Sequence, residues 1–195
     1  MNRLLCRAVF VFLLVCPRLA LGDIAGVVVA VTDGDTIKVL DSGNTQYKVR
    51  LTGIDAPEKG QPFGNVSREH LATLVAGKEV VVESEKNDRY GRALGKVWVQ
   101  PADCPNCGKT LDANHAQLLA GMAWCYRYYA KEQSPEDQGR YESSEDEARA
   151  RKWGLWADPN PINPYEWRKG KRQPLKIAVE SRASRLCRAY NDYQG

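Results

Sequence analysis

The hydrophobic pattern of the first third of the chain predicts three strands joined by tight turns. Residues 24–32 form an unbroken, β-branched apolar run, which is typical of a buried strand. A second apolar run covers residues 36–40, after a short Asp-Gly turn. In residues 47–52 apolar and polar side chains alternate, so a half-buried strand is predicted on which Arg50 faces away from Val49.

The remaining pattern predicts two more strands and several helices. We expect strands at 79–83 and 92–99, and helices at 67–76, 111–120 and 142–153. Residues 159–164 are proline-rich and are expected to be extended, and residues 175–190 fit a last amphipathic helix. Five short strands with a helix after the third indicate an α+β fold, a five-stranded Greek-key β-barrel with three packed helices and a C-terminal extension.

The first 22 residues are expected to be a signal peptide rather than part of the fold. Arg3 and Arg7 precede an apolar run at residues 8–15, and small residues follow where a signal peptidase cuts. The run is much shorter than the roughly 20 apolar residues of a membrane-spanning helix. Lipid attachment at Cys16 is a weaker alternative. We therefore expect an exported, periplasmic or secreted protein that is free of the membrane once the signal is removed.

Two further segments follow the signal, a domain at residues 23–167 and a basic extension at residues 168–195. Loss of the signal removes three of the 28 basic residues and none of the 24 acidic ones, which leaves a net charge of +1. Net charge therefore does not argue for a nucleic-acid partner, and any attraction to one must come from local clusters such as residues 168–172.

The four cysteines that remain after signal removal allow three pairings, and the sequence does not choose among them. Cys104 and Cys107 resemble half of a zinc site, but no second Cys or His pair follows and His115 stands alone. In an oxidising compartment a disulfide, local or long-range, is the favoured interpretation. Cys125 and Cys187 are the other two cysteines.

Three short polar stretches carry the candidate chemistry: residues 33–36 at a strand turn, 50–58 after a strand, and 88–92 before one. Hydrolysis of a phosphodiester needs positive charge, an activated water and a fixed geometry. Carboxylates in the first two stretches suit a hard cation such as calcium or magnesium. Arginines in the last two offer planar forks for phosphate oxygens, and a spare glutamate can act on water.

In this order and spacing, the three stretches resemble the thermonuclease (staphylococcal nuclease) family. The resemblance covers about residues 25–167, including Gly-Met-Ala at 121–123 and Gly-Leu-Trp at 154–156. It implies a barrel of the OB-fold type, calcium as cofactor, and hydrolysis of DNA and RNA to products that end in 3′-phosphate. It also implies a monomer that prefers single-stranded or locally open substrates.

The resemblance assigns roles residue by residue. For calcium it implies the carboxylates of Asp35 and Asp55 and the backbone carbonyl of Ala56. For catalysis it implies Glu58 acting on water, with Arg50 and Arg92 gripping the phosphate. For substrate binding it implies Arg89, Tyr90 and Tyr129. Arg127 stands where the family has a tyrosine.

Several of these residues also have a purely structural interpretation. The stretch 33–35 fits a plain hairpin turn, and Arg92 can pair with Asp88 across a turn. Trp124 and the tyrosines at 126–129 fit packing, and at least one of them is expected to pack. The whole chain could likewise be an inactive OB-fold module that binds nucleic acid or protein, or an exported scaffold stabilised by calcium. The enzyme is favoured because the chain has all of Asp35, Arg50, Asp55, Glu58 and Arg92.

Overall fold

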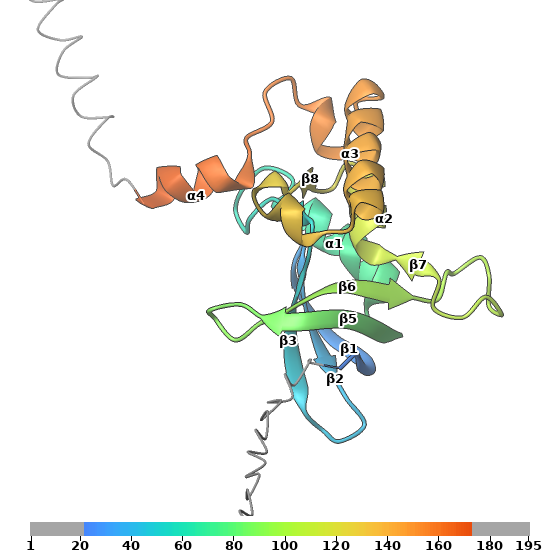
Figure 1. Cartoon of the computed structure of the whole chain (residues 1–195). Coiled ribbons are helices and arrows are strands. Elements are labelled where there is room, and N and C mark those ends of the chain that lie inside the picture. The colour runs from blue at the N-terminus through green and yellow to red at the C-terminus, as the bar shows by residue number, and fades with distance from the viewer. Residues whose placement is uncertain (1–21, 173–195) are drawn as a thin grey trace, which may run out of the picture.

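A computed structural model describes residues 22–172 of the chain (Figure 1). Most of the expected signal segment lies outside the described residues. So do Cys187 and the helix expected at 175–190. Within residues 22–172, no helix combines the length and the apolar composition needed to cross a membrane.

The fold is a closed, mixed β-barrel. Its strands follow the order β3-β2-β1-β5-β6-β7, and all neighbours in this order are antiparallel. A parallel pairing between β3 and β6 closes the barrel. The bounds are β1 Ile24–Asp33, β2 Thr36–Leu40, β3 Gln46–Leu51, β5 Glu79–Asn87, β6 Ala93–Val99 and β7 Leu111–Asp112. The expected five-stranded barrel with packed helices is confirmed, and β7 is a short addition to it.

The strand register explains which side chains leave the barrel. Val49 pairs with Ala93 in the parallel β3–β6 ladder, and both are buried inside. Arg50 pairs with Leu94 and lies on the outer face, as the alternation predicted. The barrel interior is filled by β-branched and leucine side chains that are almost fully buried, among them Ile37, Val39, Val49, Leu51, Val80, Val82, Val97 and Val99.

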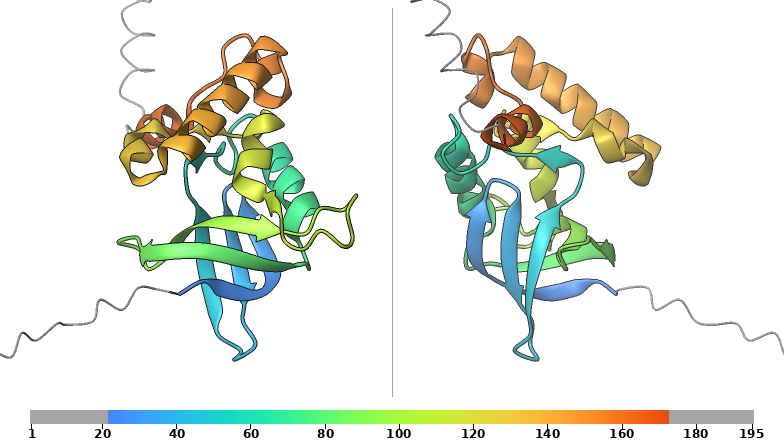
Figure 2. Two further views of the ribbon diagram at one scale, coloured as in Figure 1. Left: turned by 45° about the vertical axis from the view of Figure 1, so that its right-hand side comes forward. Right: turned by 90° about the vertical axis from the view of Figure 1, so that its left-hand side faces the viewer.

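Helices gather at one end of the barrel (Figures 1 and 2). Their bounds are α1 Gly64–Val75, α2 Ala113–Leu119, α3 Pro135–Ala150 and α4 Pro164–Arg172, with short 3-10 helices η1 Arg127–Glu132 and η2 Gly154–Ala157. A second, two-stranded sheet pairs β4 Ile54–Asp55 with β8 Trp124–Cys125 at the same end. The helices that follow β7 in the chain therefore lie at this end of the barrel, together with β4 and β8.

The three helices expected between residues 67 and 153 have different bounds in the structure, and the one expected at 67–76 begins three residues earlier, at Gly64. The helix expected at 142–153 begins seven residues earlier, because the Ser134 hydroxyl accepts from the Asp137 N–H and Pro135 occupies the first turn. The helix expected at 111–120 starts only at Ala113, since Leu111 and Asp112 pair with β6 instead. Two ion pairs at a spacing of four residues support the end of α3, Glu145 with Arg149 and Glu147 with Arg151.

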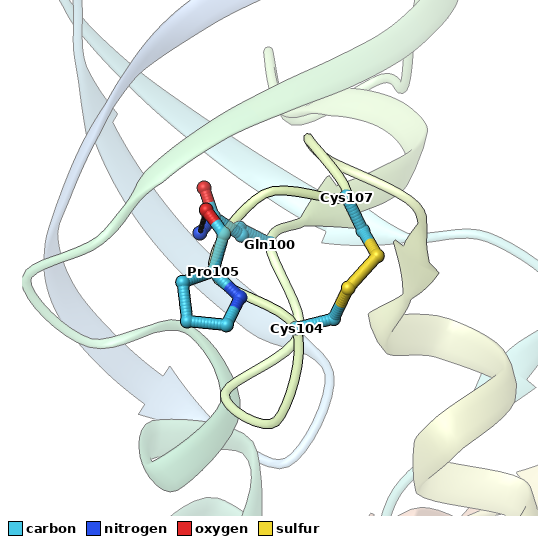
Figure 3. Close-up of a disulfide and its surroundings, with 4 residues drawn as sticks. All are labelled: Gln100, Cys104, Pro105 and Cys107. Carbon is cyan, nitrogen blue, oxygen red and sulfur yellow. Dashed lines mark hydrogen bonds between the residues drawn. A yellow bond between two sulfur atoms is a disulfide. The ribbon is translucent and has the colours of Figure 1, made fainter.

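The loop between β6 and β7 is closed by a disulfide between Cys104 and Cys107 (Figure 3). The Gln100 side chain donates to the Pro105 carbonyl at 2.6 Å, which ties the loop to the end of β6. The disulfide interpretation is thus confirmed in its local form. Cys125, the remaining cysteine among residues 22–172, is buried and unpaired there.

Candidate active site

The turn between β1 and β2 is pressed against two other elements. The side chain of Gln117, on α2, donates to the Gly34 carbonyl at 2.7 Å. A Cβ atom on Gly34 would lie 1.9 Å from the Ser67 hydroxyl oxygen on α1 and 2.7 Å from the Ala56 side chain. Only glycine permits this approach, and it sets the position of Asp35, the next residue.

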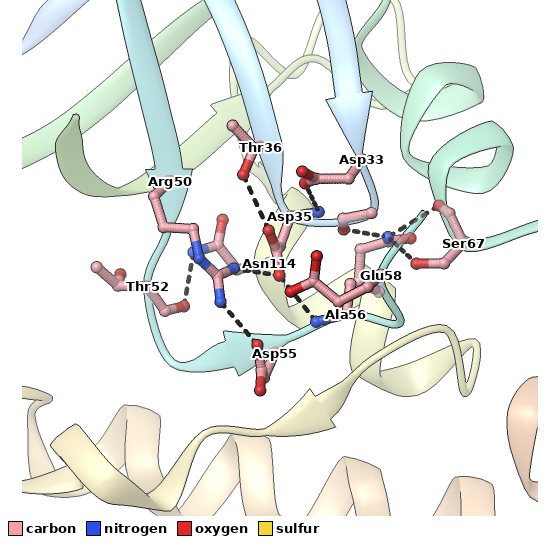
Figure 4. Close-up of polar contacts among 12 residues, drawn as sticks. Asp33, Asp35, Thr36, Arg50, Thr52, Asp55, Ala56, Glu58, Ser67 and Asn114 are labelled. Carbon is pink, nitrogen blue, oxygen red and sulfur yellow. Dashed lines mark hydrogen bonds and ion pairs between the residues drawn. The ribbon is translucent and has the colours of Figure 1, made fainter. Parts of the chain in front are cut away.

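Asp35 is buried and held from several sides. Its Oδ2 accepts from the Ala56 N–H at 2.8 Å, and its Oδ1 accepts from the Thr36 hydroxyl at 3.0 Å. The same carboxylate forms an ion pair with Arg50. A residue of the first polar stretch is thereby joined to two residues of the second (Figure 4).

Arg50 lies between two buried carboxylates. One of its terminal nitrogens faces Asp35, and the other donates to Asp55 Oδ1 at 2.9 Å. The Arg50 side chain is 13% exposed and that of Asp55 only 2%. Its position follows from the β3 alternation, which turns Arg50 outward toward the end where β4 begins.

The segment that carries Asp55 is fixed by hydrogen bonds to its backbone. Asn114 on α2 donates to the carbonyls of Thr52 at 2.9 Å and Gly95 at 3.1 Å, which anchors the chain between β3 and β4. Asp55 itself is in β4 and pairs with Trp124 of β8. Backbone pairing thus orients a carboxylate that is almost inaccessible to solvent.

Glu58 lies in the loop that follows β4. Its N–H donates to the Gln61 side chain at 3.0 Å, and its carbonyl accepts from the Gln61 N–H at 2.9 Å. The Glu58 side chain is 37% exposed, so it can meet solvent water. The structure therefore brings five of the predicted residues together, namely Asp35, Arg50, Asp55, Ala56 and Glu58.

A sixth residue, which the sequence interpretation missed, joins these five. Together the six residues form what we call the acidic cluster. Arg168 on α4 donates to Glu58 Oε1 at 2.7 Å and to both oxygens of Asp55, at 3.1 and 2.9 Å. The sequence interpretation places this residue in the basic cluster at 168–172, which begins the expected extension at 168–195 and could help to hold a phosphate backbone. The expected boundary between residues 167 and 168 lies inside α4, and no local pattern signals that Arg168 reaches the site.

The acidic groups of the cluster influence one another's ionisation. Burial raises the pKa of Asp55 above the ordinary aspartate value, with a further contribution from Asp35, while Arg168 and Arg50 oppose the rise. Burial and the adjacent Asp35 charge raise the pKa of Asp33 to about 7. Asp33 accepts from the Asp35 N–H at 3.3 Å and so belongs to the turn. The cluster concentrates negative charge, so its carboxylates need cationic partners.

The predicted residues Arg89, Tyr90 and Arg92 form a separate group at the β5–β6 turn. Arg92 is bound at 2.7 Å by Asp88, the structural pairing considered for it. Both arginines lie over the Tyr90 ring, at 4.8 and 5.6 Å from its centroid. Arg92 lies two residues before Leu94, and Leu94 pairs with Arg50 in the β3–β6 ladder. Arg50 and Arg92 therefore project from the same face of this strand pair.

Tyr129 belongs to an exposed aromatic cluster on η1. Its ring lies 4.9 Å from that of Tyr128 and 5.6 Å from that of Tyr126, centroid to centroid. The Tyr126 N–H donates to the Gly53 carbonyl at 2.8 Å, which places the cluster beside the start of β4. By contrast, Trp124 packs edge-on against Trp156 at 4.4 Å, so this aromatic residue serves packing.

Arg127, which replaces an expected tyrosine, is turned toward α3. Its guanidinium forms an ion pair with the buried Glu145 at 2.7 Å. His115 is likewise a structural residue, because its ring nitrogen is 2.7 Å from the Ser144 hydroxyl. Neither side chain contributes to the acidic cluster.

The donor chemistry of the cluster fits a hard divalent cation. The carboxylates of Asp35 and Asp55 both contact the Arg50 guanidinium, and the Ala56 backbone N–H donates to Asp35. Calcium and magnesium prefer oxygen ligands of this kind. Among residues 22–172, no three His, Cys, Asp or Glu side chains converge closely enough to form a ready-made metal cage. In this arrangement Arg50 and Arg168 supply the positive charge between the carboxylates.

Comparison with known proteins finds relatives that are described as nucleases. Residues 48–158 match the family described as staphylococcal nuclease homologue. A "Micrococcal nuclease" of Shigella flexneri is 46% identical over 155 residues, which is 78% of this chain and 85% of the relative. An "Uncharacterized endonuclease" of Escherichia coli is 40% identical over 76% of this chain and 88% of its own length. The Arabidopsis thaliana "Staphylococcal-like nuclease CAN1" is 36% identical over 65% of this chain and 35% of its own.

Proposed function

Because the chain belongs to the staphylococcal nuclease homologue family and is a hydrolytic nuclease, we propose that it is a calcium-dependent phosphodiesterase. It cleaves both DNA and RNA and leaves 3′-phosphate ends. One observation carries the proposal: Asp35, Asp55, Glu58 and Arg50, which come from a turn, two strands and a loop, meet in one acidic cluster at the end of the barrel.

In this proposal the buried and the exposed carboxylates have different roles. Asp35 and Asp55, with the Ala56 carbonyl, hold the calcium ion, which supplies electrostatic stabilisation of the charge that develops on the phosphate. Glu58 is the more exposed acid, so it is the group that accepts a proton from the attacking water. Burial keeps the other two carboxylates in place, while access to solvent allows Glu58 to meet its water.

The arginines grip the scissile phosphate. Arg50 and Arg92 leave the same face of the β3–β6 pair, and planar guanidinium groups can each bind two phosphate oxygens. Both are held by carboxylates, Arg50 by Asp35 and Asp55, and Arg92 by Asp88. Substrate phosphate therefore has to replace part of these pairings, and the arginines are prealigned by the acids until it does.

The exposed aromatic and basic groups serve the rest of the substrate. Tyr129 is 51% exposed and Tyr90 66%, so both can stack on bases. Arg89 lies beside Tyr90, where it can bind the phosphate backbone of the nucleic acid. Unstacked bases occur in single-stranded or locally open nucleic acid, which we propose as the preferred substrate. We further propose that the mature protein is an exported, periplasmic or secreted monomer, free of the membrane, on the basis of residues 1–22.

The competing function is an inactive OB-fold binding module. A module that only binds has no need of a solvent-accessible acid next to buried carboxylates, yet Glu58 is present and lies within the cluster. A calcium-stabilised scaffold would also keep its function without Glu58. The acid therefore separates the enzyme from both alternatives.

Digestion of defined DNA and RNA oligonucleotides tests the proposal. We expect cleavage with calcium, no cleavage with a calcium chelator, and products whose ends are 3′-phosphates by mass spectrometry. Glu58→Gln should lower turnover by about two or more orders of magnitude, while Glu69→Gln, an exposed acid on α1, serves as the matched control. Digestion that survives the chelator, or a Glu58→Gln variant as fast as the control, would reject the proposed function.

A further inference from the structure

Arg168 connects α4, the last described helix, to two carboxylates of the acidic cluster. It forms three hydrogen bonds with carboxylates that lie 110 and 113 positions earlier in the chain. Within residues 22–172 it is the one side chain whose guanidinium contacts both Asp55 and Glu58. These contacts raise the pKa of Arg168 above its ordinary value against the opposing effect of burial, so it is always a cation here.

The arrangement leaves Asp55 little capacity for another positive partner. Its Oδ1 accepts from Arg50 and Arg168, and its Oδ2 accepts from Arg168. An ionised carboxylate offers about four lone-pair positions, and three of those on Asp55 are taken. Two guanidinium charges also repel any further cation at this distance. A divalent ion can use Asp55 only when one of the arginines withdraws.

Arg168 is the arginine that can withdraw. Arg50 extends from β3, a barrel strand paired on both sides, and its side chain is 13% exposed. Arg168 extends from the peripheral helix α4 and is 31% exposed. The segment before α4 has its own anchor, since the Gln61 side chain donates to the Ile162 carbonyl at 2.6 Å. Arg168 can therefore leave Asp55 without releasing that anchor.

We propose that Arg168 is an internal counter-ion of the metal site, so that its pairing with Asp55 and the binding of a divalent cation are mutually exclusive. The proposal rests on the calcium dependence proposed above and adds a residue that controls it. By thermodynamic linkage, loss of the Arg168 contacts strengthens cation binding, and cation binding loosens α4 to the same extent.

Calorimetric titration with calcium chloride alone, without nucleic acid, tests the first half of this linkage. We expect Arg168→Gln to bind calcium about 5- to 100-fold more tightly than the unchanged protein, the range of typical coupling between sites. Arg168→Lys should lie between the two, because an ammonium group keeps the charge but cannot span Asp55 and Glu58. Lys169→Gln is the matched control, since Lys169 is on the same helix and pairs only locally, with Glu166 and Tyr165.

Hydrogen exchange on the unchanged protein tests the second half and needs no variant. Calcium should accelerate exchange of the α4 amides while leaving the barrel strands protected. In Arg168→Gln, α4 should exchange quickly with or without calcium. This measurement decides the question even if substitution of Arg168 lowers stability.

Equal or weaker calcium affinity in Arg168→Gln, or α4 exchange that calcium leaves unchanged, overturns the counter-ion role. If these results accompany normal calcium binding and chelator-sensitive digestion, the nuclease proposal stands and only the inference on Arg168 fails. If neither the unchanged protein nor Arg168→Gln binds calcium, both proposals fail together. An equal gain in affinity for Lys169→Gln would also reject the specific role, because net charge alone would then explain the effect.

Discussion

Individual charged side chains at the barrel end differ in how much of the fold depends on them. Arg50 and Arg92 leave the same face of the β3–β6 pair, and each is held by acids. The acids that hold Arg50 are buried, whereas Asp88, which holds Arg92, is in a turn. A buried charge that loses its partner is costly, while a partly exposed one is screened by water.

This difference predicts that two arginine substitutions separate stability from activity. Arg50→Ala should lower the free energy of unfolding by about 3 kcal/mol or more, since buried Asp35 loses its ion-pair partner and buried Asp55 loses one of its two guanidinium partners. Arg92→Ala should change it by about 1 kcal/mol or less. Both should reduce turnover by about two or more orders of magnitude if both grip phosphate. Urea unfolding without calcium, together with oligonucleotide digestion, measures the two effects. Equal stability of the two variants would contradict the burial argument.

A glycine pair gives a second prediction at this scale. Gly34→Ala places a methyl group against the Ser67 hydroxyl and Ala56, so we expect a loss of about 2 kcal/mol from overpacking. Gly139→Ala adds the same methyl group to α3, where no atom lies within 4 Å. It should stabilise the protein by about 0.5–1 kcal/mol through helix propensity. Urea midpoints that move in the same direction for both variants would refute this account.

At the scale of elements, the sequence was most informative where the structural signal is local. Period-two alternation predicted β3 and the outward direction of Arg50, because neighbouring positions in a strand decide both. The helix predicted at 142–153 lacks the first turns of α3, since residues 135–140 contain no large apolar side chain. The signal present there was the cap, Ser134 followed by Pro135 and two acids.

The part of the site that could be predicted is also the part that has a local sequence pattern. Residues 33–36 and 50–58 carried a recognisable pattern, and the structure gathers them. Arg168 could not be found, because a basic helix end looks the same in sequence whether it faces water or a buried acid. Its partners lie more than 100 residues away, and only the packing of α4 brings them together.

The cap of α3 provides a prediction at the element scale. Ser134→Ala removes the acceptor for the Asp137 N–H, which lies 3.1 Å from the hydroxyl oxygen, so it should cost about 1 kcal/mol of stability. Ser143→Ala is the control, since Ser143 is exposed within the same helix and alanine favours helix interiors. Thermal unfolding followed by circular dichroism measures both. Equal melting temperatures would show that the cap hydrogen bond contributes nothing.

At the scale of the whole molecule, the acidic cluster ties together parts of the chain that unfolding separates. Its members come from the β1–β2 turn, β3, β4, the following loop and α4, so they span residues 35 to 168. No unfolded chain keeps these side chains together. A cation that uses the cluster therefore binds the folded state alone, and its binding energy adds to the stability of the entire barrel.

Calcium should accordingly raise the melting temperature of the protein. At a concentration 100-fold above the dissociation constant the gain is about 2.7 kcal/mol, which corresponds to roughly 5–10 °C for a domain of this size. Asp35→Asn should abolish the shift, because the buried carboxylate is replaced by an amide that cannot balance the cation. Asp41→Asn is a suitable control, as Asp41 pairs with Tyr47 and backbone groups at the opposite turn. Scanning calorimetry with calcium or with chelator gives the shift. A shift that persists in Asp35→Asn would place the stabilising cation elsewhere on the molecule.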